Sequence, residues 1–197
     1  PCNTTLNLTA FIEGYWDGTS AMLPVLLNQG QPNTATECDN ITVELISPAT
    51  VAGGAPYTPD YTTTAMLNTN GTASAVFTSA VSGNYYIVIK HRNALQTWSA
   101  NAMSFPSTTS YDFSSSASQA YGSNQAEIAT GVWALFSGDL VVDENMDLLD
   151  LGLVEADISA FSFGYLATDI NGDGNVDLLD SPVLETNISN FVFSAHP

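Results

Sequence analysis

Residues 169–180 read Asp-Ile-Asn-Gly-Asp-Gly-Asn-Val-Asp-Leu-Leu-Asp. Oxygen-bearing side chains stand at positions 1, 3, 5, 9 and 12 of this stretch, and a glycine stands at position 6, where a loop of this spacing turns sharply. Ca²⁺ takes six to eight oxygen ligands, which such a loop wraps around one ion. The sequence therefore predicts a Ca²⁺ site whose ligands are Asp169, Asn171, Asp173, Asn175 through its main-chain carbonyl, Asp177 and Asp180.

A poorer copy of this loop begins at Asp139. The sequence Asn-Met-Asp-Leu-Leu-Asp at 145–150 repeats Asn-Val-Asp-Leu-Leu-Asp at 175–180. Val141 replaces the ligand at position 3 and Glu144 replaces the turn glycine, and both changes should weaken ion binding. This copy either holds a second ion, with water filling the gap, or is a decayed repeat kept for packing. Its candidate ligands are Asp139, Asp143, Asn145, Asp147 and Asp150.

Residues 139–150 are called loop 1 below, and residues 169–180 are called loop 2. Two tandem Asp-rich loops of the EF-hand type, each followed by a short helix, resemble a dockerin domain, and residues 138–197 carry this resemblance. The resemblance implies a cohesin-like partner, because dockerins bind cohesins through helix residues near positions 10 and 11 of each loop. Here these are Leu148-Leu149 and Leu178-Leu179. The two pairs either dock a partner or pack onto the preceding part of this chain, and we expect the second.

The charge of the chain is strongly negative. It has 20 acidic residues against two basic ones, and twelve of the acids lie after residue 138. Without bound cations that segment would repel itself. The lack of a basic patch excludes nucleic acid as a partner and disfavours anionic membrane surfaces. No stretch has the roughly 18–20 apolar residues of a membrane helix. No signal peptide is recognised in the sequence, so if the protein is exported, as we expect, its signal peptide has been removed.

The chain has two cysteines, Cys2 and Cys38. Their spacing fits no zinc or redox motif, and two cysteines in an exported protein indicate one disulfide. The alternative is a pair of free thiols in a reducing compartment. We expect the disulfide, which would tie the N-terminal strand to the segment that precedes the strand at 41–46.

Residues 1–114 have the pattern of β-strands. Apolar and polar residues alternate in 6–12 and 41–46, with the period of half-buried strands, and Asn70-Gly71 is a strong hairpin signal. Short strands broken by Gly, Pro and Asn predict a mainly β protein, with an immunoglobulin-like antiparallel β-sandwich followed by a small α-helical pair of calcium loops. The predicted domains are the β-sandwich at 1–114, a connector with a final strand at 115–137, and the dockerin-like domain at 138–197.

A series of short motifs runs through the β part and the connector. They are His91-Arg92-Asn93, Thr97-Trp98-Ser99-Ala100, Tyr121-Gly122, Gly131-Val132-Trp133-Ala134-Leu135 and Ser137-Gly138-Asp139. With these motifs the chain resembles a module found at the ends of secreted and surface proteins of Bacteroidota, in which a β-sandwich is fused to a dockerin-like pair. The resemblance implies an exported bacterial protein that works outside the cell or at its surface, and it implies no activity.

The sequence contains no catalytic constellation, and we expect no enzyme. His91 has no Ser or Cys nucleophile arranged with it, and no phosphate-binding loop or His-Glu-x-x-His motif occurs. The close carboxylate pairs outside the two loops, such as Glu37 with Asp39, are expected in exposed turns. Tyr15-Trp16 would stack on a sugar ring if exposed, or cap the sandwich if packed inward.

These features predict a non-enzymatic, Ca²⁺-stabilised extracellular structural or adhesive protein. Its expected partner is itself, in a homo-oligomer or filament, or another surface protein. The filament hypothesis rests on the strand Thr4–Ile12, which at a chain end is well placed to add to the open sheet edge of a neighbour. The alternatives are a carbohydrate-binding module that takes glycans and a dockerin-type anchoring module that binds a cohesin-like partner.

Overall fold

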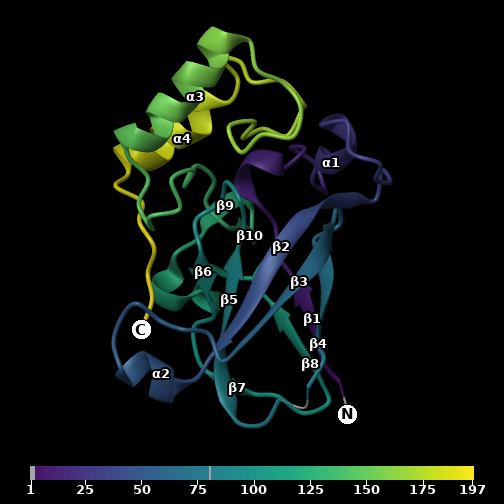
Figure 1. Cartoon of the computed structure of the whole chain (residues 1–197), viewed down its shortest axis with the longest axis vertical. Coiled ribbons are helices and arrows are strands. Elements are labelled where there is room, and N and C mark those ends of the chain that lie inside the picture. The colour runs from purple at the N-terminus through teal and green to yellow at the C-terminus, as the bar shows by residue number, and fades with distance from the viewer. Residues whose placement is uncertain (1–2, 80) are drawn as a thin grey trace.

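Strands make up the body of the molecule, and two helices lie across one of its ends (Figure 1). The computed structural model describes residues 3–79 and 81–197. Its strands are β1 (Thr4–Thr9), β2 (Glu37–Ile46), β3 (Tyr61–Asn68), β4 (Thr72–Phe77), β5 (Asn84–Lys90), β6 (Thr97–Trp98), β7 (Met103–Ser104), β8 (Thr108–Asp112), β9 (Ala126–Ala129) and β10 (Val132–Ala134). Its helices are α1 (Val25–Asn28), α2 (Pro48–Ala52), α3 (Leu148–Ala160) and α4 (Ser181–Ser189), with 3₁₀ turns at Glu13–Tyr15, Ala117–Gln119 and Tyr121–Ser123.

The described strands form one curled sheet and a separate hairpin of β9 and β10. The sheet runs in the order β6-β5-β2-β3-β4-β1-β8, and β7 pairs with β5. Its pairs are antiparallel except that β1 lies parallel to β8, with Thr5 opposite Thr108. The prediction of a mainly β, sandwich-like body is confirmed, but the purely antiparallel, immunoglobulin-like arrangement is wrong. Parallel neighbours cannot be joined by a hairpin, and here the pairing strands lie far apart in the sequence.

The strands follow the alternation in the sequence. In β1 and β4 every second side chain faces the core, so that Leu6, Leu8 and Ala75 are buried. Asn70-Gly71 makes the turn between β3 and β4, as predicted, and Gly71 adopts φ +83°, where a side chain would be strained. Residues 95–105 contain only the short strands β6 and β7.

Besides a small cluster of Ile46, Val88 and Trp98, two apolar clusters stabilise the described part of the molecule. The larger one lies inside the curled sheet and includes Leu6, Ile41, Ile87 and Phe113. The smaller one lies between the sheet and the two C-terminal helices, so the helical segment packs directly on the β part. Its buried members are Leu95, from the β part, with Leu140, Met146, Val154, Ile170 and Leu184.

Residues 115–137, expected to be a connector with a final strand, belong to the body of the molecule. They contain two 3₁₀ turns and the β9–β10 hairpin. After β10 the chain joins the N-terminal segment, because the Leu135 N–H donates to the Phe11 carbonyl (2.8 Å) and the Glu13 N–H donates to the Leu135 carbonyl (3.0 Å). The segment in which a final strand was predicted thus contains β10, and hydrogen bonds join its end to the N-terminal part of the chain.

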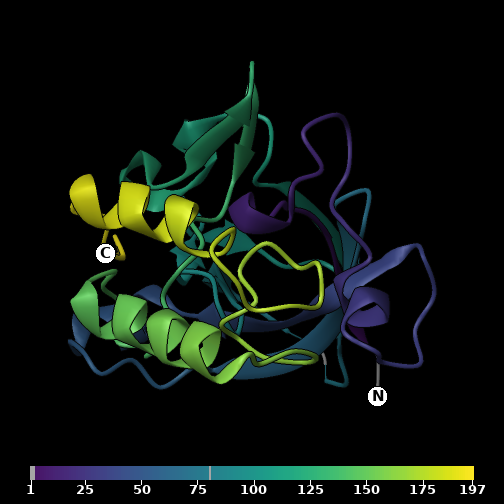
Figure 2. The same cartoon turned by 90° about the horizontal axis from the view of Figure 1, so that it is seen from above.

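The helices α3 and α4 lie side by side over one end of the sheet, as the view from above shows (Figure 2). Isolated bridges join the end of each helix to the loop before the other one: Phe163 pairs with Asn175, and Phe193 pairs with Asn145. The helices therefore run antiparallel, and each follows its own Asp-rich loop. None of the described helices has both the length and the apolar character that crossing a membrane requires.

Strand β1 is an interior strand. It pairs with β4 along one edge and with β8 along the other, and the Ala10 N–H continues the contact by donating to the Gly71 carbonyl (2.9 Å). The structure therefore corrects the idea that Thr4–Ile12 is free to add to the sheet of a neighbour. In the described sheet, the path of paired strands ends at β6 and β8 instead.

The predicted Cys2–Cys38 disulfide involves Cys2, which lies outside the described residues. Cys38 is fully buried at the start of β2, with its Sγ 3.9 Å from the Sδ of Met22. The register of the sheet places Thr4 at the end of β1 that lies away from Cys38. The disulfide stays a prediction, and this register does not favour it.

Candidate functional site

Loop 2 closes around its first and last carboxylates. The N–H groups of Gly172 and Gly174 donate to the two oxygens of Asp169, each at 2.8 Å. Asp169 and Asp180 are both fully buried. The Asp180 carboxylate accepts N–H groups from Ile170 (2.7 Å), Asn171 (3.0 Å) and Asp177 (2.9 Å). Backbone N–H groups of the loop thus hold both carboxylates, at positions 1 and 12, inside it.

Loop 1 has the same internal architecture. The Asp139 carboxylate accepts the N–H groups of Asp143 (3.1 Å) and Glu144 (3.3 Å). Residues 139–150 thus repeat the hydrogen-bond pattern of loop 2. At position 12, the Asp150 carboxylate accepts N–H groups from Leu140 (2.7 Å), Val141 (2.9 Å) and Asp147 (2.9 Å).

Two positions distinguish the loops. Gly172 and Gly174 adopt φ +75° and +96°, which glycine tolerates without strain. Their counterparts in loop 1, Val142 and Glu144, adopt φ +58° and +74°. These values are unfavourable for L-residues, and most of all for a β-branched one. The expected strain at Glu144 is confirmed, and the structure adds Val142 to it.

The other predicted ligands of loop 2 lie on its open side. Asp173 and Asp177 are exposed, and Asn171 is half-buried. The bridge between Phe163 and Asn175 uses the Gly174 carbonyl, and the Asn175 carbonyl accepts no hydrogen bond from the residues that the structure describes. The donor set consists of oxygens alone, which suits a hard cation such as Ca²⁺.

The geometry does not by itself establish a metal site. Within residues 3–79 and 81–197, no three Asp, Glu, His or Cys side chains converge closely enough to hold a metal ion. The candidate set also depends on two asparagines and a main-chain carbonyl. Binding of Ca²⁺ therefore stays a prediction at this point.

The buried carboxylates of the two loops are electrostatically unfavourable. Burial raises the pKa of Asp139 to about 6, and the neighbouring Asp150 carboxylate adds to this effect. Burial likewise raises the pKa of Asp180 to about 6, with a further contribution from Asp169. Burial also raises the pKa of Asp169 itself. A bound divalent cation would offset this concentration of negative charge.

We predict that, in the presence of a chelator, the protein becomes more stable as the pH falls from about 7 to about 4. Asp139 and Asp180 have a pKa of about 6 in the folded chain and an ordinary value of 3.8. The folded chain therefore binds these protons more tightly, and protonation stabilises it across that window. Thermal melting in chelator at a series of pH values measures the effect. A melting temperature that falls steadily between about pH 7 and 5 would contradict it.

The two leucine pairs are exposed, which corrects the expectation that they pack onto the β part. Leu148 is 72% exposed and Leu178 is 75% exposed, and the second leucine of each pair is similarly open. Leu148 and Leu149 open α3, whereas Leu178 and Leu179 lie in the turn just before α4, and neither pair reaches the core. The core positions of the two repeats are taken by Val154 and Leu184 instead.

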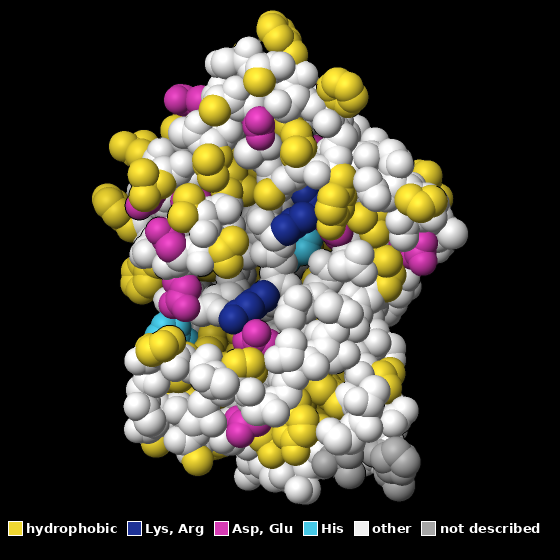
Figure 3. Space-filling model, viewed as in Figure 1, with side chains coloured by type: hydrophobic (Ala, Val, Ile, Leu, Met, Phe, Trp, Pro, Cys, Tyr) yellow, Lys and Arg dark blue, Asp and Glu magenta, His cyan; other side chains and the backbone are white. Residues whose placement is uncertain are grey.

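Each repeat also ends on exposed phenylalanines. Phe161 and Phe191 are 86% and 84% exposed, and both have φ +54°, the left-handed conformation in which glycine usually ends a helix. The bridges at Phe163 and Phe193 bring each phenylalanine pair near the loop of the other repeat. Figure 3 shows such apolar side chains projecting from the helical end of the molecule. They form apolar patch 1 (Leu148, Leu149, Phe191 and Phe193) and apolar patch 2 (Leu178, Leu179, Phe161 and Phe163).

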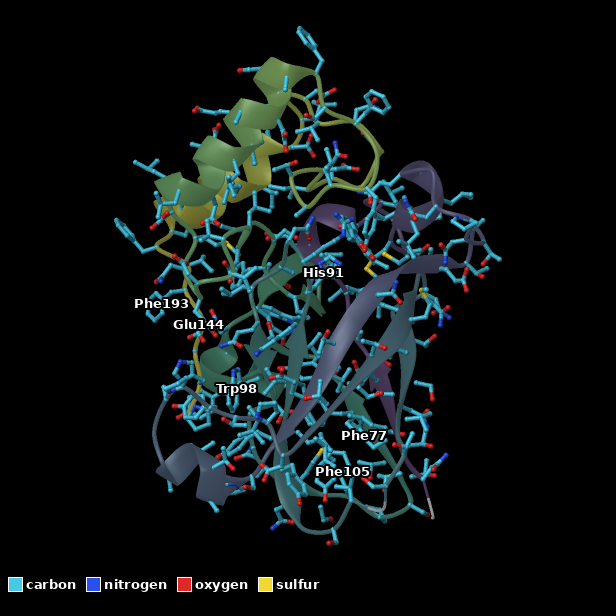
Figure 4. The ribbon with its side chains drawn as sticks, in the orientation of Figure 1. Phe77, His91, Trp98, Phe105, Glu144 and Phe193 are labelled. Atoms are coloured by element: carbon cyan, nitrogen blue, oxygen red, sulfur yellow. The ribbon has the colours of Figure 1, made fainter. Side chains whose placement is uncertain are left out.

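A buried polar cluster lies where the sheet meets loop 2. The Arg92 Nε donates to the Asp39 Oδ2 (2.9 Å), and the His91 Nε2 lies 3.1 Å from the same oxygen; Figure 4 shows His91 at this junction. Burial would raise the pKa of Asp39, but the hydrogen bonds and charges of His91 and Arg92 outweigh it and lower that pKa. Asp39 was expected in an exposed turn, and its full burial corrects this.

Gln29 and Asn93 extend this cluster to loop 2. The Gln29 Oε1 accepts from the Arg92 Nη2 (2.7 Å), and the Gln29 Nε2 donates to the Asp169 Oδ2 (2.6 Å). The Asn93 Nδ2 donates to the Asp169 carbonyl (3.3 Å). Sequence reasoning missed both residues. The one signal available was that Arg92, one of only two basic residues, stands in the run His91-Arg92-Asn93.

The last residues of the chain contact both loop 1 and the β part. The His196 Nε2 lies 3.2 Å from the Glu144 Oε2. The imidazole ring lies 5.3 Å from the Tyr57 ring and 5.8 Å from the Trp98 ring, between centroids. Figure 4 places Phe193, Glu144 and Trp98 along the same side of the molecule. The tail thus ties loop 1 to the edge of the sheet.

Comparison with known proteins supports the fold. No family model matches the chain, and no curated protein matches it in sequence. Several solved structures are similar, among them two type II cohesin–X-dockerin complexes from Acetivibrio cellulolyticus that carry interface mutations. One matches with a TM-score of 0.54 at 15% identity, and the other with 0.50 at 16% identity.

The match extends over nearly the whole molecule. In both cases it covers 94% of this chain and 95% of the matched chain. Most of the β part and most of residues 138–197 therefore have a counterpart in one component of such a complex. At this level of identity the likeness shows the fold alone.

Proposed function

We propose that this protein is a non-enzymatic, extracellular assembly module that binds another protein through its two loop–helix repeats, with Ca²⁺ stabilising loop 2. The observation that supports this most directly is the exposure of the same apolar residues at equivalent positions of both repeats. Large apolar side chains that gather on an exposed surface often mark an interaction site. The proposed partner is a cohesin-like β-sandwich protein, in keeping with the complexes whose fold this chain resembles.

The conformation of the phenylalanines supports the same proposal. A phenylalanine in the left-handed conformation is strained by about 1–2 kcal/mol, and Phe161 and Phe191 both carry this strain while remaining exposed. Neither the strain nor the exposure helps this chain to fold. Burial of one of these rings against a partner would offset its strain and exposure, because aromatic side chains in a buried contact contribute much of the binding free energy.

Calcium is proposed for loop 2 on the strength of its donor set and its charge. Twelve acidic residues and no basic ones follow residue 138. Ca²⁺ at loop 2 would neutralise part of this charge, and ion binding that requires the folded loop stabilises the fold. Loop 1, which lacks the position-3 ligand and has strained residues at positions 4 and 6, is proposed to bind more weakly.

The test is binding to a panel of immobilised cohesins, measured by surface plasmon resonance in Ca²⁺ and in chelator. The double variant Leu148→Glu/Leu178→Glu changes both patches at once. Each patch presents two leucines and two phenylalanines, so a patch left intact would still bind the partner. We expect it to bind at least about 30-fold more weakly, since a buried anchor contributes about 2 kcal/mol or more.

The matched control is Val76→Glu, which places the same charge on an exposed apolar site of β4. It should bind like the unchanged protein. Docking through the repeats is contradicted if no cohesin binds, or if the double variant binds as well as Val76→Glu does.

The other two hypotheses have less support. Trp16 is half-buried and packs edge-on against Phe11, with 5.0 Å between the ring centroids, so part of the ring is already engaged within the fold. The hypothesis of self-assembly through β1 is no longer supported, because both edges of β1 are already paired.

A further inference from the structure

We propose that the Ca²⁺ site of loop 2 includes positioning residues from the β part: Gln29, held by Arg92, fixes the Asp169 carboxylate at ligand position 1. The inference rests on the proposed Ca²⁺ binding and deepens it. Affinity at loop 2 then depends on the contact between the sheet and the helical segment, and not on the twelve loop residues alone.

The Gln29 side chain has one workable orientation. It is buried, and its Nε2 donates to the Asp169 carboxylate (2.6 Å) while its Oε1 accepts from the Arg92 guanidinium (2.7 Å). Reversing the amide would place two acceptors against each other at one end and two donors at the other. Arg92 is in turn fixed by the buried Asp39 carboxylate (2.9 Å). A chain of charge-assisted hydrogen bonds therefore runs from β2 to ligand position 1 of loop 2.

The backbone of loop 2 packs against α1, the helix that Gln29 directly follows. The Asn28 Nδ2, at the end of α1, donates to the Gly172 carbonyl (2.9 Å). A Cβ on Gly172 would lie 2.4 Å from the Val25 Cγ2, and a Cβ on Gly174 would lie 2.4 Å from the Asn28 carbonyl oxygen. Both distances are too short for a side chain, so the two glycines allow close docking as well as the positive φ values.

Loop 1 lacks this support. Its Asp139 carboxylate accepts hydrogen bonds only from N–H groups of its own loop within the described residues. Val142 and Glu144, which stand where loop 2 has its two glycines, are exposed. The β part therefore positions the first ligand of one repeat and not of the other, and loop 1 serves as an internal control.

The experiment is calorimetric titration with Ca²⁺ in an Asp143→Ala background, which removes a loop 1 ligand so that loop 2 is measured alone. In that background Gln29→Leu keeps the size of the side chain but removes both hydrogen bonds. We expect Ca²⁺ to bind 10–100-fold more weakly, the range typical for the loss of a group that orients a metal ligand. Gln31→Leu is the matched control, because the Gln31 side chain makes no hydrogen bond within the described residues, and it should leave the affinity unchanged.

A second measurement keeps the test independent of how well Gln29→Leu folds. Because coupling is reciprocal, Ca²⁺ should slow amide hydrogen exchange in residues 25–31 of the unsubstituted chain, and Asp173→Ala should abolish that protection. The inference is overturned if Gln29→Leu folds and binds Ca²⁺ as tightly as Gln31→Leu does. It is also overturned if Ca²⁺ does not change the rate of amide hydrogen exchange in residues 25–31. In both cases Ca²⁺ binding itself stands. If the Asp143→Ala chain itself binds no Ca²⁺, the proposed function of loop 2 fails with it.

Discussion

Removal of Ca²⁺ with a chelator is expected to lower the melting temperature of this protein by about 5–10 °C. An ion present at 100 times its dissociation constant, and bound only to the folded chain, stabilises that chain by about 2.7 kcal/mol. For a chain of this size, each kcal/mol corresponds to roughly 2–4 °C. The effect should be large because Asp169 and Asp180 are fully buried and like-charged, so the ion would offset an unfavourable interaction already present in the fold.

The control for this prediction is Asp173→Ala. Asp173 is exposed and stands at position 5 of loop 2, so its removal deletes a ligand without opening a cavity. The variant should melt at a similar temperature with and without Ca²⁺. Scanning calorimetry measures both chains, and a melting curve of the unchanged protein that does not respond to chelator would rule out loop 2 as a structural Ca²⁺ site.

The second large effect is expected from Asp39→Asn. Asp39 is fully buried, and its Oδ2 accepts from Arg92 (2.9 Å) and lies 3.1 Å from the His91 Nε2. The substitution removes the carboxylate charge and leaves the largely buried Arg92 without its counterion. Breaking a buried ion pair by removing one partner destabilises by roughly 3–5 kcal/mol.

Urea unfolding measures this change against Glu155→Gln, which makes the same change of charge at an exposed position of α3. The control should alter the free energy of unfolding by less than about 0.5 kcal/mol, as most surface substitutions do. Equal stability of the two variants would show that the buried cluster does not hold the sheet and loop 2 together.

The parts of the fold that the sequence predicts well are those with local causes. The alternation in β1 and β4, the Asn70-Gly71 turn and the two Asp-rich loops all depend on residues close together in the chain. The parallel pairing of β1 with β8 could not be predicted in this way. It joins segments about one hundred residues apart, and no local pattern specifies which strand becomes the neighbour.

The same distinction explains the errors at the candidate site. Asp39 has the sequence context of an exposed turn, and it is buried only because His91 and Arg92 from a distant strand end satisfy its carboxylate. Leu148-Leu149 and Leu178-Leu179 look like core residues by type. They are exposed, because the cluster beneath the two helices is filled by residues further along each repeat, such as Val154 and Leu184, which the loop repeat alone does not reveal.

The central claim is that loop 2 takes up Ca²⁺ as part of a folded docking module, and native mass spectrometry tests it most directly because it counts bound ions. The unchanged protein, exchanged into micromolar Ca²⁺, is expected to carry at least one ion per chain, and Asp173→Ala is expected to carry one fewer. Contradiction would come from a folded, unchanged protein that carries no Ca²⁺, or from an Asp173→Ala chain that carries as many ions as the unchanged one.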